Sequence, residues 1–262
     1  SANPEKTLGV LPDLGEVLAL RRLDRLCADI GALYDPGARL VICSDGRVFS
    51  DLVQVSDDSV SRYGEELARI IADEGLSRLS TFNLDDFFPA GLGYDGMRAR
   101  LVESHGVPLE EVRDRVLAEP DFRSLFDGIH RFLFEDLVVL QPALSRNKLR
   151  LRAKELAYGV IQRSNAWSGL VESRFPEAVR LSIHPQPAHS RKIGIQLVAS
   201  SNLWRTPWHA SVLFDGKEHT LVRRADAEAM GAILMKANDR YAFFVLPGAL
   251  PGGTTDVVRS LN

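Results

Sequence analysis

Several features that would narrow the class of this protein are scarce or missing. Its 262 residues include only two cysteines, Cys27 and Cys43, too few for a disulfide framework and compatible with a reducing cytoplasm. No apolar run reaches the ~18 residues that a membrane-spanning helix needs, and no signal-peptide sequence opens the chain. The sequence therefore predicts a cytoplasmic protein with no membrane partner.

Common signatures of nucleotide, nucleic-acid and metal sites are missing too. The chain has no GxGxxG or Walker sequence, and its net charge of -3 gives no general attraction to nucleic acid. HExxH and HxH spacings are also absent, which counts against a metal-dependent hydrolase. Such an enzyme, built on His184, His189, His209 and Asp45, remains one alternative.

Helix and strand signals alternate in the first part of the chain. Asp13 and Glu16 have the spacing of a capping box, before a helix that Pro36 and Gly37 end. Residues 38–43 predict a buried strand, 48–55 an extended piece, and 76–84 a return to the sheet after a helix that Asp57 caps. Ser44 and Asp45 then lie at the carboxyl end of a strand, where ligands gather in open α/β sheets, although Asp45-Gly46 is also an ordinary turn.

The rest of the chain predicts a helical segment followed by strands. Helical spacing dominates from about 84 to 173, and strands are expected at 180–184, 192–197, 206–214, 219–224 and 241–246, with a short helix from Asp226 to about Met235. We expect one α/β catalytic domain over residues 1–262. It has a Rossmann-like mixed sheet flanked by helices, a largely helical middle and an antiparallel C-terminal portion.

One face of the strands between 180 and 214 carries an unusual mixture of polar side chains. With a two-residue period, Arg180, Ser182 and His184 share a face, and Lys192 and Gln196 belong to the polar face of the next strand. His209 is the second histidine candidate. This mixture indicates the lining of a polar pocket, and the alternative is an ordinary half-solvated antiparallel sheet.

Four segments in order resemble one family over nearly the whole chain. They are KTLGVLPDLGE (6–16), SDGRVFSD (44–51), ELAYGVIQRSNAW (155–167) and RLSIHPQ…K…WRTPWH (180–209). Together they resemble the pyoverdine and dityrosine biosynthesis family, the isonitrile (isocyanide) synthases, and most closely its bacterial paerucumarin and pyoverdine-chromophore branch. Members carry a further N-terminal segment, so SANP is expected to lie partway through a KSPN-like motif.

The resemblance implies an activity and its partners. The amino nitrogen of an aromatic L-amino acid becomes an isocyanide, ribulose 5-phosphate supplies the carbon, and no metal or organic cofactor is implied. An iron(II) and 2-oxoglutarate dioxygenase would then oxidise the product. The resemblance to tyrosine-using members favours L-tyrosine, with L-tryptophan as an alternative, and a non-catalytic sugar-phosphate binding protein remains open.

This chemistry assigns roles to the candidate residues. Imine formation needs proton transfers, for which His184 and His209 are suited near neutral pH, although a histidine is often structural. Lys192 is a proton shuttle, phosphate ligand or Schiff-base amine, or else a solvated strand lysine. The substrate-binding candidates are Arg163 and Arg180 for the phosphate, Ser44 and Asp45 near the amine, and Trp204 and Trp208 around the aromatic ring.

Overall fold

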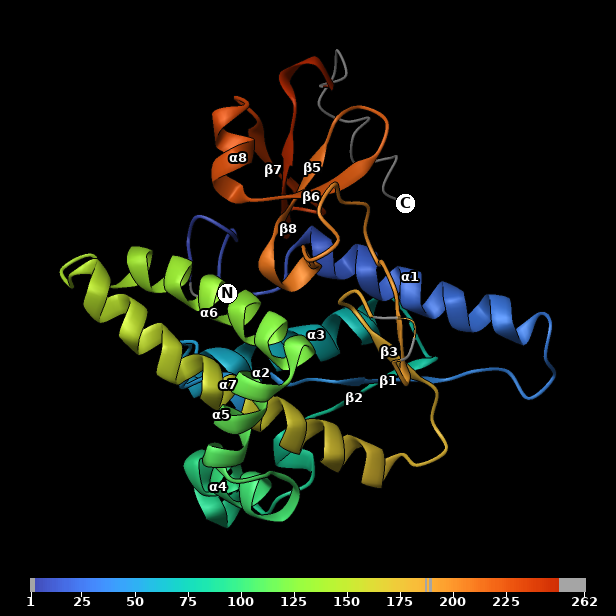
Figure 1. The fold of residues 1–262 in the computed structure, drawn as a ribbon. Coiled ribbons are helices and arrows are strands. Elements are labelled where there is room, and N and C mark those ends of the chain that lie inside the picture. Colours follow the sequence, from blue (N-terminus) through green and yellow to red (C-terminus); the bar gives the residue numbers. More distant parts are fainter. Residues whose placement is uncertain (1–2, 187, 189, 250–262) are drawn as a thin grey trace.

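The computed structural model describes residues 3–186, 188 and 190–249 (Figure 1). No helix in these ranges has the length and apolar character needed to cross a membrane. The α-helices are α1 Leu14–Gly31, α2 Gly46–Phe49, α3 Asp57–Asp73, α4 Gly93–His105, α5 Leu109–Ala118, α6 Pro120–Leu140, α7 Arg146–Arg174 and α8 Arg224–Ala229. The strands are β1 Leu40–Cys43, β2 Leu79–Phe82, β3 Arg180–Ser182, β4 Lys192–Gly194, β5 Ser211–Phe214, β6 His219–Val222, β7 Ile233–Ala237 and β8 Tyr241–Val245. Short 3-10 turns include η1 Leu84–Asp86, η2 Ala90–Leu92, η3 Pro207–His209 and η4 Pro247–Ala249.

The described strands form three separate sheets. β1 pairs with β2, and β3 pairs with β4, each in parallel. The third sheet has the order β6-β5-β8-β7, with antiparallel outer pairs and a parallel central pair, β5 and β8. The mixed α/β class is confirmed, whereas a single Rossmann-like sheet is not seen in the described part of the chain. The C-terminal portion is antiparallel only in its two outer pairs.

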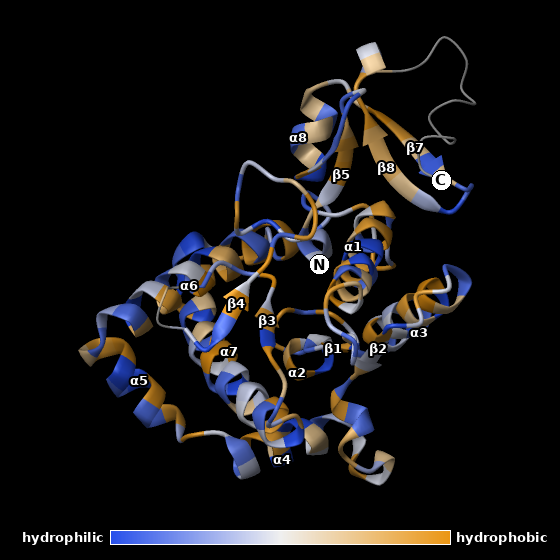
Figure 2. Ribbon diagram, turned by 90° about the vertical axis from the view of Figure 1, so that its right-hand side faces the viewer, coloured by the Kyte–Doolittle hydropathy of each residue, from blue (hydrophilic) through white to orange (hydrophobic). Residues whose placement is uncertain are grey.

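The largest apolar cluster joins the C-terminal sheet to the first part of the chain through α1. Leu20 on α1 and Ile70 on α3 are fully buried in the same cluster as Val212 and Phe243 of the C-terminal sheet. The other face of that sheet packs on α8 through Ala227. Figure 2 shows α1 directly below the hydrophobic strands β5 and β8. Burying one such side chain contributes about 1.5–3 kcal/mol, so this layer is a main source of stability.

The predicted capping box at the start of α1 is confirmed. Asp13 accepts a hydrogen bond from the Gly15 amide at 2.7 Å, and Glu16 accepts one from the Asp13 amide at 2.8 Å. The first turn of α1 lies against η3, since a Cβ on Gly15 would be in ordinary contact with Pro207 at 3.5 Å and would be tight only against Oδ1 of Asp13 at 3.1 Å. The capping box therefore fixes the end of α1 that lies against η3.

The predicted helical middle is confirmed and is organised by α7, which has 29 residues. α7 packs along α6 through Leu149 and Ala153, and both figures show these helices side by side. Further along, Tyr158 and Ile161 pack with α5, and Trp167 packs with α4 and β2. One helix thus connects most of the elements between residues 46 and 174.

Four local predictions are wrong. The segment predicted to extend over 48–55 begins as α2, and the side chain of Ser56, not Asp57, caps α3. α8 ends at Ala229, before Gly231 with φ +70°, so Met235 lies in β7. Residues 207–209 form η3 in place of the start of a strand, because proline fixes φ near −65° and has no N–H for a ladder.

Candidate active site

Ser44 and Asp45 lie directly after β1, as predicted. The Ser44 amide donates to the Phe82 carbonyl at 2.9 Å, and the Asp45 carbonyl accepts from the Val48 amide at 2.9 Å, which begins α2. The Asp45 residue is accessible to solvent, but surrounding protein atoms desolvate its carboxyl group and raise its pKa to about 6. The nearby Lys192 ammonium opposes this rise. This carboxyl group therefore exchanges protons close to neutral pH.

Lys192 and Arg180 are paired neighbours on β4 and β3. Desolvation lowers the pKa of half-buried Lys192, and the like charge of Arg180 lowers it further, while Asp45 and Glu172 act in the opposite direction. Arg180 also donates to the Ser168 carbonyl at 3.3 Å and lies 3.9 Å from Glu172. The structure thus brings Arg180, Lys192 and Asp45 into one charged group.

His184 and His209 are not on adjacent strands, which corrects the prediction. His184 follows β3, and His209 is the last residue of η3. The Nδ1 atom of each ring is buried and has no hydrogen-bond partner among the described residues. Burial lowers the pKa of His184. Burial lowers the pKa of His209 to about 3, and the charge of Lys6 acts in the same direction. Both rings are therefore neutral near pH 7.

The two tryptophan candidates flank these histidines. The ring of Trp204 lies 6.0 Å from the ring of His184 at an interplanar angle of 30°, and the residue is 64% exposed. Trp208 is half-buried in η3, next to His209. Trp204 thus presents an exposed aromatic face beside His184, whereas Trp208 is partly used in packing.

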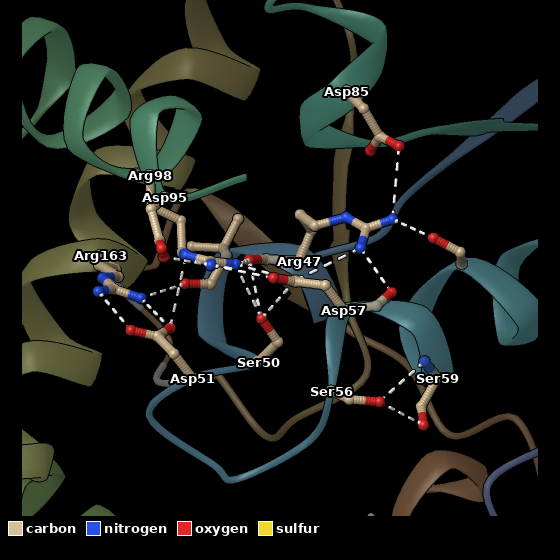
Figure 3. A network of polar contacts seen from close by, with 12 residues as sticks. Arg47, Ser50, Asp51, Ser56, Asp57, Ser59, Asp85, Asp95, Arg98 and Arg163 are labelled. Atoms are coloured by element: carbon tan, nitrogen blue, oxygen red, sulfur yellow. Dashed lines mark hydrogen bonds and ion pairs between the residues drawn. The ribbon is translucent and has the colours of Figure 1, made fainter. Parts of the chain in front are cut away.

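Arg163 lies apart from these residues, in the polar network of Figure 3. Its guanidinium forms a two-pronged ion pair with Asp51 on the segment after α2, and it donates to the Val48 carbonyl at 2.9 Å. Its donors are therefore occupied, and the predicted phosphate role requires the Asp51 pair to open. That role stays a prediction.

The same network contains two buried arginines that the sequence did not single out. Arg47 and Arg98 are each 4% exposed. Arg98 donates to both carboxylate oxygens of Asp57 at 2.9 and 3.0 Å, and Arg47 donates to the Asp57 carbonyl at 2.7 Å. Burial would raise the pKa of Asp57, but hydrogen bonds from Arg98 and Ser50 lower it below its ordinary value. The network holds α2, and with it Asp45, against α3 and α4. The motif SDGRVFSD contained the signal, because it places an arginine and an aspartate on one short segment.

A second missed feature is the pair of Lys6 and Asp136. Nζ of Lys6 lies 2.6 Å from Oδ1 of Asp136 on α6, and both side chains are at most 10% exposed. The sequence could have pointed to Lys6, because this residue begins the first family-like motif. It gave no indication of Asp136, which lies 130 residues away. The pair places the N-terminal segment beside His209.

Two surface pockets do not coincide with the predicted residues. One, of about 260 Å³, is lined by Lys6 together with Phe134, Val138, Arg146 and Arg223. The other, of about 440 Å³, lies beside Cys27, Arg39 and Arg78. Neither pocket is lined by Asp45, His184, Lys192 or His209.

No group of three His, Cys, Asp or Glu side chains in the described ranges is arranged to hold a metal ion. His189, one ligand of the hydrolase alternative, lies outside the described residues. That alternative gains no support from the described side chains.

Known proteins resemble this chain over most of its length. Two L-tryptophan isonitrile synthases of Fischerella ambigua are 47% and 44% identical to it, over 93% and 94% of the chain and 74% and 77% of their own lengths. An L-tyrosine isonitrile synthase of Pseudomonas aeruginosa is 39% identical over 94% of the chain and 76% of its own length. The expectation that tyrosine-using members are the most similar is therefore wrong.

Structural comparison identifies the same group of proteins as sequence comparison. The crystal structure of the PvcA protein from Pseudomonas aeruginosa superposes with a TM-score of 0.86 at 38% identity, covering 93% of this chain and 79% of that one. The family model described as "Pyoverdine/dityrosine biosynthesis protein" matches residues 1–234. The chain thus belongs to the pyoverdine/dityrosine biosynthesis protein family.

Proposed function

We propose that this chain, acting as one catalytic domain, is an isonitrile synthase that converts the amino group of an aromatic L-amino acid into an isocyanide. Three relatives that are 47%, 44% and 39% identical to this chain are named isonitrile synthases. The two with the higher identities act on L-tryptophan, so L-tryptophan replaces L-tyrosine as the proposed substrate. Ribulose 5-phosphate as carbon donor is the proposal that the family resemblance implies.

The observation that carries this proposal is the grouping of titratable residues with shifted pKa values. Condensing an amine with a ketone needs one group that accepts a proton and another that helps water leave. His184 is neutral near pH 7 and is the proposed base, while Asp45, with a pKa of about 6, is the proposed proton donor and amine contact. Lys192, whose pKa is lowered, is the proposed proton shuttle.

The proposed substrate contacts follow from charge and exposure. Arg180 and Lys192 are the two cations proposed to bind the phosphate. Arg180 lies 3.9 Å from Glu172, and Lys192 has no carboxylate within ion-pair distance among the described residues. Trp204 is the proposed surface for the aromatic ring, since it is exposed beside His184. The product is proposed to pass to an iron(II) and 2-oxoglutarate dioxygenase.

A labelling experiment tests the proposal. Purified protein is incubated with uniformly ¹³C-labelled ribulose 5-phosphate and either L-tryptophan or L-tyrosine, and the products are identified by mass spectrometry. We expect an isocyanide that gains one labelled carbon, with a higher kcat/KM for L-tryptophan. A higher kcat/KM for L-tyrosine would restore the original substrate prediction.

Two other results would favour the alternatives. Binding of ribulose 5-phosphate without product from any aromatic amino acid would identify a sugar-phosphate binding protein. Stoichiometric zinc or iron in the purified protein, required for hydrolysis of a test ester, would identify the hydrolase.

A further inference from the structure

The pocket of about 260 Å³ is not used by the proposed chemistry and lies where separate parts of the chain meet. Its lining residues come from the N-terminal segment, from α6, from the first residue of α7 and from the residue that precedes α8. Figure 1 shows the N-terminal end of the chain beside α6. Pockets for drug-sized ligands measure about 300–1,000 Å³, so this one suits a smaller molecule.

One wall of the pocket is apolar. Phe134 and Val138 are one turn apart on α6 and share a face of that helix, and Val139 extends the wall. All three residues are half-buried, so each keeps apolar surface that a ligand can cover. Covering this surface with an apolar side chain removes both from water and favours binding.

Two cations of the lining are already compensated by carboxylates of α6. Nζ of Lys6, a residue that is 5% exposed, lies 2.6 Å from Oδ1 of Asp136. A guanidinium nitrogen of Arg223 lies 3.2 Å from Oε2 of Glu135. These pairs join the N-terminal segment and the start of α8 to α6. A ligand must therefore be recognised by other charges.

The two remaining charged residues of the lining have opposite signs. Arg146, at the start of α7, and Glu5, in the N-terminal segment, are both exposed, and neither forms an ion pair with another described residue. The guanidinium carbon of Arg146 lies 5.8 Å from the centroid of the Phe134 ring, so this cation stands beside the apolar wall. An anionic ligand would be repelled by Glu5 and a cationic one by Arg146. A ligand with one charge of each sign satisfies both residues.

We propose that this pocket is a binding site for a free amino acid with an apolar side chain. The carboxylate of the ligand binds the Arg146 guanidinium through two parallel hydrogen bonds, and its ammonium binds the Glu5 carboxylate. The side chain of the ligand packs on Phe134, Val138 and Val139. This site goes beyond the proposed function and does not depend on it, since none of the proposed catalytic residues lines the pocket.

Equilibrium dialysis of the purified protein against radiolabelled L-leucine tests the charge requirement. L-Leucine has both charges and an aliphatic side chain, whereas the proposed activity uses aromatic amino acids. Two analogues each lack one charge: 4-methylpentanoate has no ammonium, and 3-methylbutylamine has no carboxylate. We expect one L-leucine to bind per chain and each analogue to compete at least tenfold more weakly, because it loses a charge-assisted hydrogen bond. Absence of saturable L-leucine binding, or equal competition by either analogue, would overturn the proposal.

Two substitutions locate the bound amino acid. Arg146→Gln and Glu5→Gln each remove one charge from an exposed side chain, so the melting temperature should stay within a few degrees of the parent while Kd for L-leucine rises at least tenfold. Arg150→Gln is the matched control and should keep the parental Kd, because Arg150 lies over the same Phe134 ring at 5.5 Å but does not line the pocket. Parental affinity in Arg146→Gln and Glu5→Gln would overturn the proposal, since L-leucine would then bind elsewhere. A parent protein that binds L-leucine here but makes no isocyanide would remove the proposed function and leave this site standing.

Discussion

Two carboxyl groups at the start of α1 make the stability of this protein depend on pH in an unusual direction. Asp13 is 8% exposed and Glu16 is 4% exposed, and neither forms an ion pair with a lysine, arginine or histidine of the described residues. Burial, followed by the charge of Glu16, raises the pKa of Asp13 from 3.8 to about 9. The pKa of Glu16 is raised by burial too, while Tyr63 donates to it at 2.7 Å. The pair therefore holds a shared proton at neutral pH.

The sign of the effect follows from comparing the folded and unfolded chains. Because the folded pKa of Asp13 lies above the unfolded value, the folded state binds one more proton than the unfolded state between about pH 4 and pH 9. This stabilisation is complete below the unfolded pKa and is lost as pH rises through the folded pKa. Each pH unit in that window removes about 1.4 kcal/mol, so the loss from pH 5 to pH 7 is about 2.5 kcal/mol.

Asp13→Asn/Glu16→Gln removes both titrating groups while keeping the shape of the capping box. Urea unfolding at pH 5, 6 and 7, followed by tryptophan fluorescence, gives the free energy of unfolding of each protein. We expect the parent to lose about 2.5 kcal/mol more than the variant between pH 5 and pH 7. Asp58→Asn, an exposed residue in the first turn of α3, is the control and should follow the parent. The three histidines with lowered pKa values remain in both proteins, so their contribution to the pH dependence cancels in the comparison. Parallel pH dependences of the free energy of unfolding in parent and double variant would therefore refute the shared proton.

Four further substitutions test other parts of the structure. His184→Ala and Lys192→Ala should each lower turnover at least tenfold. The melting temperature should change little, because both side chains are half-buried and outside the main apolar clusters. A folded variant with parental turnover would remove that residue from the site. Arg163→Ala should lower the free energy of unfolding by about 1–3 kcal/mol in urea titrations, since Asp51 loses its partner. A raised KM for ribulose 5-phosphate at unchanged stability would instead support the original phosphate role. Arg98→Met should lower the free energy of unfolding by about 3–5 kcal/mol, because it leaves Asp57 in the network without its two-pronged partner. A decrease below about 1 kcal/mol would show that solvent replaces the Arg98 guanidinium.

Local sequence patterns were sufficient to predict the helices and strands that are determined by neighbouring residues. The capping box of α1, the apolar stripes of the middle helices and the strands at 79–82 and 241–245 all follow from spacing within one turn or one strand. The segment after β1 was predicted to be extended because its valines and phenylalanine favour strands, whereas its conformation is set by contacts of Arg47 and Val48 with distant elements.

Pairings between distant residues account for what the sequence did not predict in the site. Arg180 and Lys192 were predicted on the polar faces of their strands and Asp45 at a strand end, and the structure brings these three residues together. Lys6 and Asp136 are separated by 130 residues. The buried Nδ1 atoms of His184 and His209, which have no hydrogen-bond partner among the described residues, depend on packing that a two-residue period does not describe. Proline at position 207 delays the start of the predicted strand to Ser211, and this signal was available in the sequence.

The uninterrupted length of α7 limits how this chain tolerates insertions and deletions. One added residue in a helix turns everything after it by about 100° and shifts it by about 1.5 Å. An insertion before Arg163 would therefore separate it from Asp51 and would also move Trp167 out of register with β2. Homologues are expected to vary in length at the connection between α6 and α7, residues 141–145, and to keep a constant number of residues between Leu149 and Trp167.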